Sequence, residues 1–423
     1  MSLFSSLSVC LAGVCLLLVA AAHVQGADGG EDMVTGRFID TKDCLVGYRA
    51  WVPGDVKQLR GVIVGSMGAN WDYTHFVARP LWQAAARHWR FALVGTNNRK
   101  KAALKKGDAA TGEDFLKGLA QIAAESGHAE LKNAAICSFG FSRGAAYSLT
   151  LARALPDRVV AIGCGGSNPR WGFTNEAAKA ACSVPILLTQ GDEDNLAGKD
   201  WFTQFPEVRE MGHRAALAGQ WGLSHFEGNY ENLVMIHFDA VIRERLDPAW
   251  DPGKAPPKLK EIALDKGWLG KLAGCEKWGT KWVDVKPAAE IEARERKDYC
   301  WFVNETVARA WQSFALRQNA VMLRKPFCDS VDYIASRELP PPHPAGEPMA
   351  LEAISHWFGA TTGVVFFAGA ERIADGKRKG GEISKTWTAV WEKPRPGVHA
   401  IYAVFSKAGY RCPTKPCPMV VTD

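Results

Sequence analysis

The first 26 residues of the chain contain no Lys, Arg, Asp or Glu. They are apolar from about Val9 to Ala22, and polar sequence begins after Gly26. This pattern is typical of a signal peptide, although the usual positive start is missing. A single transmembrane anchor is the alternative, but the apolar run is short for a spanning helix, and no later segment is apolar enough to span a bilayer. We therefore expect residues 1–26 to be removed and the mature protein to be secreted or periplasmic, without stable membrane insertion.

The chain also lacks a strong excess of either charge. Its 51 Lys and Arg residues oppose 45 Asp and Glu residues, a net charge of +6 over 423 residues. This balance gives no reason to expect a nucleic-acid partner or an anionic membrane. The densest basic run, Arg99–Lys101 with Lys105 and Lys106, is most simply a solvated loop.

No Cys-x-x-Cys pair or matching His spacing occurs, so a zinc site is not expected, and we predict no metal and no cofactor. Of the 11 cysteines, all except Cys10 and Cys15 lie beyond the leader. That odd remainder means that at least one stays a thiol. In an oxidising compartment, Cys412 and Cys417 could close a small loop. Other pairings remain open, such as Cys164 with Cys182 or Cys275 with Cys300.

Short apolar runs alternate with amphipathic stretches between residues 27 and 246. This alternation predicts an α/β domain with a mostly parallel sheet and helices on both faces. The expected strands are Met33–Ile39, Val46–Val52, Gly61–Gly65, Phe91–Gly95, Ala134–Phe139, Val159–Cys164 and Pro185–Thr189. The expected helices are Pro80–His88, Gly112–Glu125, Arg143–Ala154 and Phe202–His213.

The pattern changes after residue 246. Residues 247–257 are rich in Pro, Asp and Gly, and the rest of 247–318 has helical patterning, notably at Glu305–Leu316. We expect 247–318 to be a linker or helical segment. Residues 319–423 contain short alternating strands between turn residues, which predicts a small all-β sandwich.

One motif indicates chemistry. Gly140-Phe141-Ser142-Arg143-Gly144 follows an apolar strand and opens an Ala-rich helix, which is the setting that a G-x-S-x-G nucleophile elbow requires. Glycines are needed because side chains in so tight a turn would clash with the helix and the neighbouring strand. Ser142 is therefore the candidate nucleophile, and a Gly-Ser turn without chemistry is the alternative.

A serine hydroxyl needs a base and a carboxylate that orients the base. Around such an elbow the chain order is serine, acid, histidine. The acid should follow the next-to-last strand, and there Asp194 stands three residues after Gly191. Asp192 and Glu193 are possible substitutes, and a solvated acidic loop is the alternative.

Three histidines follow in the right region. His225 lies in a loop between an apolar stretch and a helix, the position expected of the base. His237 lies within a helical apolar pattern typical of packed residues, and His213 lies near a helix end. We therefore choose His225.

An oxyanion hole needs backbone N–H groups directed at the developing charge. One should belong to Arg143, the residue after the nucleophile. The second should come from the loop after Gly61–Gly65, from Ser66 or Met67. An ordinary strand-to-helix turn is the alternative interpretation of that loop.

With these motifs in order, residues 46–245 resemble an α/β-hydrolase of the esterase and polyhydroxybutyrate-depolymerase kind. The resemblance is carried by YRAWVP at 48–53, the GFSRG elbow, LPDR at 155–158, QGDED at 190–194 and GLSH at 222–225. It implies ester hydrolysis through an acyl-enzyme, without a cofactor. One departure from the family pattern is the missing His-Gly pair at the first oxyanion loop, where Gly65-Ser66-Met67-Gly68 stands.

The last hundred residues resemble bacterial Ig-like modules, through VVFF at 364–367 and GVHAIYA at 397–403. This likeness identifies no ligand. Trp387 and Trp391 could stack on a sugar, but alternate-strand tryptophans are more often core residues.

The leading hypothesis is a serine hydrolase of carboxylic esters. Its substrate would be a small-molecule or polymeric ester, such as a feruloyl, acetylxylan or short-chain polyester, and could be linked to a polysaccharide. Trp71, Trp171 and Trp221 could accept an aromatic acyl group or a polymer chain, although core packing is the simpler interpretation of each. A serine peptidase and a non-catalytic extracellular binding or adhesion protein on the same scaffold are the alternatives.

Overall fold

The computed structural model describes most of the chain beyond residue 31. The described residues are 32–34, 46–68, 71–97, 108–166, 173, 176–196, 200–226, 228–275, 283–317, 321–325, 340–355, 361–407 and 409–423. The expected signal peptide, the basic run at 99–106, Trp171, Cys44 and Cys328 lie outside them. Within these ranges, no helix has the length and apolar character needed to cross a membrane.

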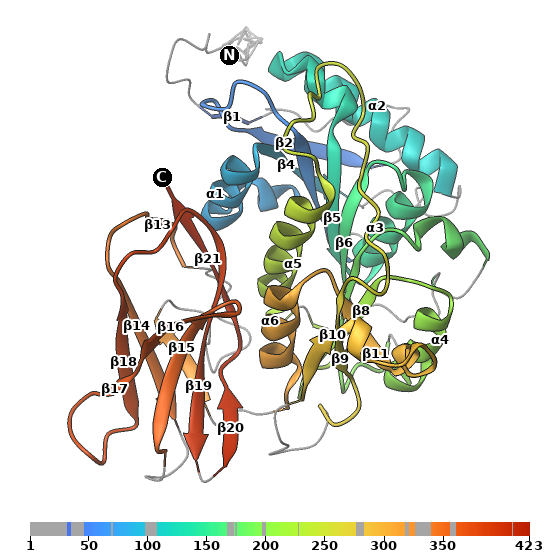
Figure 1. The fold of residues 1–423 in the computed structure, drawn as a ribbon. Coiled ribbons are helices and arrows are strands. Elements are labelled where there is room, and N and C mark those ends of the chain that lie inside the picture. The colour runs from blue at the N-terminus through green and yellow to red at the C-terminus, as the bar shows by residue number, and fades with distance from the viewer. Residues whose placement is uncertain are drawn as a thin grey trace, which may run out of the picture.

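An eight-stranded mixed sheet forms the centre of the molecule (Figure 1), with the strand order β1-β2-β4-β3-β5-β6-β7-β8. β1 pairs antiparallel with β2 and β2 antiparallel with β4, and all later neighbours are parallel. The strands are β1 Met33–Val34, β2 Gly47–Val52, β3 Gly61–Ser66, β4 Phe91–Asn97, β5 Ala135–Phe141, β6 Val159–Gly165, β7 Ile186–Gly191 and β8 Ala215–Gln220. The largely parallel sheet expected from the apolar runs is therefore present.

Helices cover both faces of this sheet (Figure 1). α1 (Pro80–Trp89) and α5 (Tyr230–Arg245) lie on one face, and α2 (Asp108–Ser126) and α3 (Arg143–Ala154) lie on the other. α4 (Trp201–Glu210) precedes β8. Short 3₁₀ helices are η1 Thr74–Ala78, η3 Ala129–Asn133, η4 Glu176–Ala181, η5 Ala288–Glu290 and η6 Ala293–Asp298.

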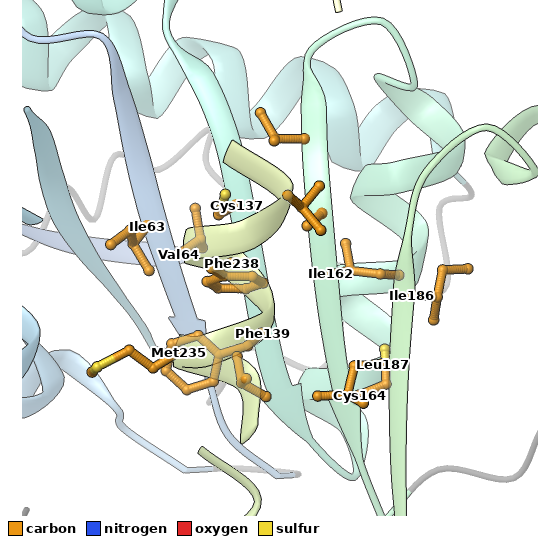
Figure 2. Close-up of a cluster of buried hydrophobic side chains, with 14 of the residues drawn as sticks. Ile63, Val64, Cys137, Phe139, Ile162, Cys164, Ile186, Leu187, Met235 and Phe238 are labelled. Carbon is orange, nitrogen blue, oxygen red and sulfur yellow. The ribbon is translucent and has the colours of Figure 1, made fainter. Parts of the chain in front are cut away.

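Aromatic packing joins α1 and α5 to the middle of the sheet. The ring of Phe139 on β5 stacks on Trp82 of α1, with centroids 4.9 Å apart, and contacts Phe238 of α5 at 6.3 Å. Figure 2 shows Met235 and Phe238 lying over Phe139, with Ile63 of β3 beside them. This buried cluster fixes β5 in the middle of the sheet, at the strand that leads into the elbow.

The segment 247–317 is more than the linker or helix expected from its sequence. It contains a three-stranded antiparallel sheet in the order β10-β9-β11, besides helix α6 (Glu305–Ala315). The strands are β9 Trp268–Lys271, β10 Val285–Pro287 and β11 Tyr299–Phe302. They are too short for their alternation to stand out in the sequence.

This segment packs along β8, the edge strand of the central sheet. Trp311 of α6 donates its indole N–H to the Leu217 carbonyl at 2.7 Å, and the Leu217 N–H lies 3.2 Å from Cys300 Sγ. Apolar residues of β9, β11 and α6 belong to the same buried cluster as the sheet. The segment therefore extends the core and covers a sheet edge.

The C-terminal residues form two sheets that face each other (Figure 1). One has the order β12-β14-β18-β17, and the other has the order β13-β21-β19-β15-β16, with β20 also paired to β19. Their inner faces share one apolar cluster that includes Trp387 and Trp391, each 8% exposed. The core interpretation of these two tryptophans is therefore correct. The strands are β12 Val321–Lys325, β13 His343–Pro344, β14 Met349–Ser355, β15 Gly363–Ala368, β16 Glu371–Asp375, β17 Lys377–Arg378, β18 Thr386–Trp391, β19 Gly397–Lys407, β20 Tyr410–Pro413 and β21 Cys417–Thr422.

The suggested Cys412–Cys417 loop is wrong. Cys417 is disulfide-bonded, whereas Cys412 remains a thiol whose pKa burial raises to about 12. Cys412 lies opposite Phe405 and Cys417 opposite Ile401, four positions apart along β19. At about 3.3 Å per residue that offset is about 13 Å, twice the Cα separation that a disulfide spans.

Candidate active site

The elbow places Ser142 between β5 and α3 in an uncommon backbone conformation. Its φ is 55° and its ψ is −118°, and among the described non-glycine residues only Arg90 also has a positive φ. Its N–H donates to the Gly165 carbonyl at 2.8 Å, and its carbonyl accepts from Ala145 and Ala146 in the first turn of α3. Such a conformation costs free energy and persists because the surrounding hydrogen bonds impose it.

The two motif glycines are required by close backbone contacts. A Cβ at Gly140 would lie 2.3 Å from the Gly144 carbonyl carbon, and a Cβ at Gly144 would lie 2.3 Å from the Ser66 oxygen. No real side chain tolerates these distances, since the neighbouring atoms are backbone. The steric reason for the glycines that the sequence suggested is therefore present.

The structure brings Asp194 and His225 together. His225 Nδ1 lies 2.7 Å from Asp194 Oδ2, and the carboxylate is buried. Gln190 Nε2 donates to the same oxygen at 2.7 Å, and the Leu196 N–H donates to Oδ1 at 2.9 Å. Three donors therefore fix the plane of the carboxylate and, through it, the plane of the imidazole.

The two substitutes for Asp194 are placed differently. Asp192 Oδ1 accepts from the Gly222 N–H at 2.5 Å, and Arg317 lies 3.7 Å from its other oxygen. Glu193 is exposed, and its N–H donates to the Leu223 carbonyl. Asp192 thus ties together the loops that follow β7 and β8.

His225 lies in the loop after β8 and packs on the elbow. Its ring centroid is 4.9 Å from that of Phe141, the residue before Ser142, and its side chain is 20% exposed. With Nδ1 directed at Asp194, Nε2 is the nitrogen left to exchange a proton with a reacting group.

The other two histidines are packed residues. His213 and His237 are buried, and burial lowers the pKa of each to about 4. Their Nε2 atoms lie within 3.1 Å of the Phe173 carbonyl and 3.5 Å of the Pro185 carbonyl, respectively. Neither contacts the elbow.

The loop after β3 lies against the same elbow. Ser66 is paired with Gly140 in the sheet register, and the Met67 nitrogen is 2.8 Å from the Cβ position of Gly144. A Cβ at Gly68 would lie 3.7 Å from Ser142 Cβ. The candidate oxyanion positions Ser66, Met67 and Arg143 therefore converge around the serine.

A buried charge network holds this loop in place. Tyr73 donates to Glu231 Oε1 at 2.7 Å, Trp82 donates to Glu231 Oε2 at 2.9 Å, and Arg79 pairs with the same carboxylate. Burial acts to lower the pKa of Arg79, but the charge of Glu231, the Tyr73 hydroxyl and the hydrogen bonds to both together outweigh it and raise that pKa. Glu231 on α5 thus anchors the segment that follows the oxyanion loop.

Sequence reasoning missed Gln190 and Phe141 as neighbours of the acid and the base. Both lie within quoted motifs, but only the folded loops show what their side chains contact. Trp221 donates to the Ala315 carbonyl at 2.7 Å and packs on Phe202, which makes it a packing residue. Among the residues described, no group of three or more His, Cys, Asp or Glu side chains is arranged to hold a metal ion.

Several solved structures to which about half of this chain is similar are esterases or hydrolases. A cold-adapted esterase from an Arctic intertidal metagenomic library is 14% identical, with a TM-score of 0.35, over 48% of this chain and 88% of its own. The S-formylglutathione hydrolase from Agrobacterium tumefaciens is 12% identical, with a TM-score of 0.36, over 52% and 97%. The acetyl xylan esterase from Aspergillus awamori is 11% identical, with a TM-score of 0.35, over 46% and 94%.

Residues 46–246 have the largely parallel sheet with helices on both faces that the sequence predicted (Figure 1). No protein-family model matches the chain, and no curated protein matches it significantly. Identities and TM-scores this low carry no argument about the chemistry, which has to come from the residues of this chain.

Proposed function

We propose that the protein is a serine hydrolase of carboxylic esters with Ser142 as nucleophile, His225 as base and Asp194 as the orienting acid. The observation that carries the proposal is the 2.7 Å contact between His225 Nδ1 and Asp194 Oδ2, with the His225 ring packed on the elbow. A buried carboxylate, an accessible imidazole and a serine on a strained turn form the set that nucleophilic acyl transfer requires.

Acylation uses these three groups together. Ser142 Oγ attacks the ester carbonyl carbon while its proton passes to His225 Nε2. The tetrahedral intermediate then collapses, the C–O bond to the alcohol breaks, and the alcohol leaves with the proton from His225. The ionised Asp194 stabilises the imidazolium formed between these steps.

Deacylation repeats the sequence with water. His225 takes a proton from water, the hydroxyl adds to the acyl carbon, and Ser142 Oγ recovers the proton as the acid leaves. Backbone N–H groups of Arg143 and of Ser66 or Met67 would stabilise the oxyanion. Removing one oxyanion donor typically lowers the rate by about 10²–10³-fold. The geometry of the loop after β3 should therefore strongly affect the rate.

The setting of this activity is part of the proposal. An exported protein is supported by the apolar leader and by the disulfide at Cys417, because disulfides persist in oxidising compartments. The two facing sheets of the C-terminal region support an Ig-like module. Feruloyl, acetylxylan and polyester substrates, including esters linked to polysaccharide, are the classes to test.

Hydrolysis of a p-nitrophenyl ester series by the mature protein tests the proposal. We expect kcat to fall by about 10⁶-fold in both Ser142→Ala and His225→Ala, because the triad acts as a unit. A fluorophosphonate probe should label the wild type and leave Ser142→Ala unlabelled. A wild type that does not hydrolyse the esters but cleaves peptides would favour a peptidase. A wild type that the fluorophosphonate probe does not label would favour a binding protein.

A further inference from the structure

Three large apolar side chains are exposed at the edge of the sheet that carries the site. Trp71 is 56% exposed, Leu196 is 71% exposed and Phe226 is 65% exposed. Single exposed hydrophobic residues are ordinary on protein surfaces, so exposure alone means little. Their positions along the chain distinguish these three.

Each of the three lies in a loop that carries residues of the proposed site. The Trp71 N–H donates to the Gly68 carbonyl at 3.3 Å, and Gly68 lies against Ser142. The Leu196 N–H donates to Asp194 Oδ1, and Phe226 is the residue after His225. The loops that carry the oxyanion groups, the acid and the base therefore each place one apolar side chain in solvent.

These loops leave the sheet on one side. β3, β7 and β8 point the same way, so their carboxyl ends meet at the edge where Ser142 stands. The backbone at two of these positions is held by hydrogen bonds to site residues, which fixes where the side chains emerge. The other large exposed hydrophobic residues of the described chain lie away from this edge: Val34 on β1, Ile383 between β17 and β18, Val390 on β18 and Tyr410 on β20.

We infer that Trp71, Leu196 and Phe226 form an apolar rim on which the acyl chain of the substrate lies, so that the enzyme favours esters of long aliphatic acids over acetyl esters. The inference rests on the proposed function, because the rim is defined by its place around Ser142, Asp194 and His225. The group that lies on the rim should be apolar, since all three side chains of the rim are apolar. It must also reach the serine, which an ester's acyl group does.

The expected effect follows from apolar burial. Each methylene that leaves water for an apolar contact contributes close to a fourfold gain in binding, so a few such contacts separate octanoyl from acetyl esters by tenfold or more. Replacing the three rim residues with serine would leave the backbone unchanged and remove most of the apolar area of the rim. Selectivity for chain length should therefore fall while the triad stays intact.

The test compares the wild type, Trp71→Ser/Leu196→Ser/Phe226→Ser and the control Ile383→Ser. Ile383 is 92% exposed in the C-terminal region, so Ile383→Ser is a matched control that removes an exposed apolar side chain outside the rim. The readout is the ratio of kcat/KM for p-nitrophenyl octanoate to that for p-nitrophenyl acetate, with fluorophosphonate labelling and thermal unfolding measured in parallel. We expect a wild-type preference for octanoate, a ratio about tenfold lower in the triple variant and an unchanged ratio in Ile383→Ser.

The outcomes separate the two proposals. An active, labelled wild type whose ratio is the same in the triple variant overturns the rim and leaves the ester hydrolase standing. A wild type that prefers acetate also overturns it. A wild type that is neither active nor labelled overturns both. Should the triple variant unfold, the single variants replace it, and each must lower the ratio by a smaller factor for the inference to hold.

Discussion

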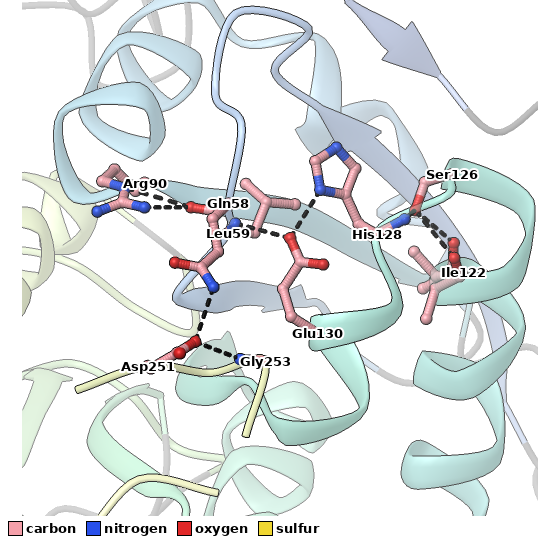
Figure 3. Close-up of polar contacts among 10 residues, drawn as sticks. Gln58, Leu59, Arg90, Ile122, Ser126, His128, Glu130, Asp251 and Gly253 are labelled. Carbon is pink, nitrogen blue, oxygen red and sulfur yellow. Dashed lines mark hydrogen bonds and ion pairs between the residues drawn. The ribbon is translucent and has the colours of Figure 1, made fainter. Parts of the chain in front are cut away.

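The amino and carboxyl edges of the central sheet differ in the hydrogen bonding of their loops and in the exposure of their apolar side chains. At the amino ends of β3 and β5, the loops are joined by hydrogen bonds between side chains and backbone (Figure 3). Glu130 accepts from the Leu59 N–H at 2.9 Å and lies 2.8 Å from His128 Nδ1. Other bonds at this edge run from Arg90 to the Gln58 carbonyl and from Gln58 and Gly253 to Asp251.

At the carboxyl ends of the same strands the arrangement is different. Ser142 has a strained backbone, His225 is partly exposed, and Trp71, Leu196 and Phe226 lie in solvent. Open α/β sheets bind their ligands at the carboxyl ends of the strands. The amino edge stabilises the fold through hydrogen bonds between its loops, whereas the carboxyl edge holds the strained Ser142 backbone and the three exposed apolar side chains.

The largest effect should come from Gly144→Ala at the carboxyl edge. Its new Cβ would lie 2.3 Å from the Ser66 oxygen, so we expect the free energy of unfolding to fall by about 3 kcal/mol or more. Gly68→Ala is the matched control, since its Cβ meets only Ser142 Cβ at 3.7 Å, an ordinary contact. Urea denaturation of both variants checks this, and equal stabilities would mean that the elbow is looser than these contacts indicate.

The sequence predicted those parts of the fold that depend on local patterns. The Gly61–Gly65 run and the strand before the elbow are continuous apolar stretches, and both are strands in the largely parallel sheet. β8 escaped prediction because Ala-Ala-Leu-Ala-Gly-Gln has little β propensity, and neighbouring β7 and β11 decide its conformation. Tertiary packing overrode the local signal there.

The candidate site was predictable to a similar extent. The motif order selects Ser142, Asp194 and His225 because the fold sets the order of its loops. The Gln190 and Leu196 donors to Asp194 were not predictable, since they depend on how one loop turns after β7. The exposure of Leu196 and Phe226 depends in the same way on what the folded chain leaves uncovered.

A smaller effect should reveal the strain at Ser142. Glycine adopts a positive φ at little cost, so Ser142→Gly should be about 1 kcal/mol more stable than Ser142→Ala, although we expect both to be inactive. Arg90→Gly is the comparison at the amino edge. Arg90 also has a positive φ, but its guanidinium bonds to the Gln58 carbonyl, so glycine should bring no net gain there.

Chemical denaturation of these three variants beside the wild type measures the difference. Equal stability of Ser142→Gly and Ser142→Ala would show that the elbow conformation carries no strain. A gain at Arg90 as large as that at Ser142 would remove this distinction between the two edges.

The smallest effect should come from Glu130→Gln at the amino edge. Burial acts to raise the pKa of Glu130, but hydrogen bonds from His128 and the Leu59 N–H outweigh it and lower the pKa below its ordinary 4.5. Because the folded-state pKa is the lower one, protons bind the unfolded state more readily, and the stabilisation is present above about pH 4.5 and lost as the pH falls through the folded-state value. We expect Glu130→Gln to lower the free energy of unfolding by about 1 kcal/mol at pH 7.

That deficit should shrink in acid, because the amide has no proton to gain while the wild-type carboxylate does. Esterase activity per folded molecule should not change, since Glu130 lies at the edge opposite Ser142. Urea midpoints between pH 7 and pH 3, with ester hydrolysis assayed at pH 7, check both parts. A deficit that stays constant with pH would show that the side chain acts through its shape. A loss of activity would show that the two edges are coupled through the sheet. The distinction between an amino edge that stabilises the fold and a carboxyl edge that carries the site would then be wrong.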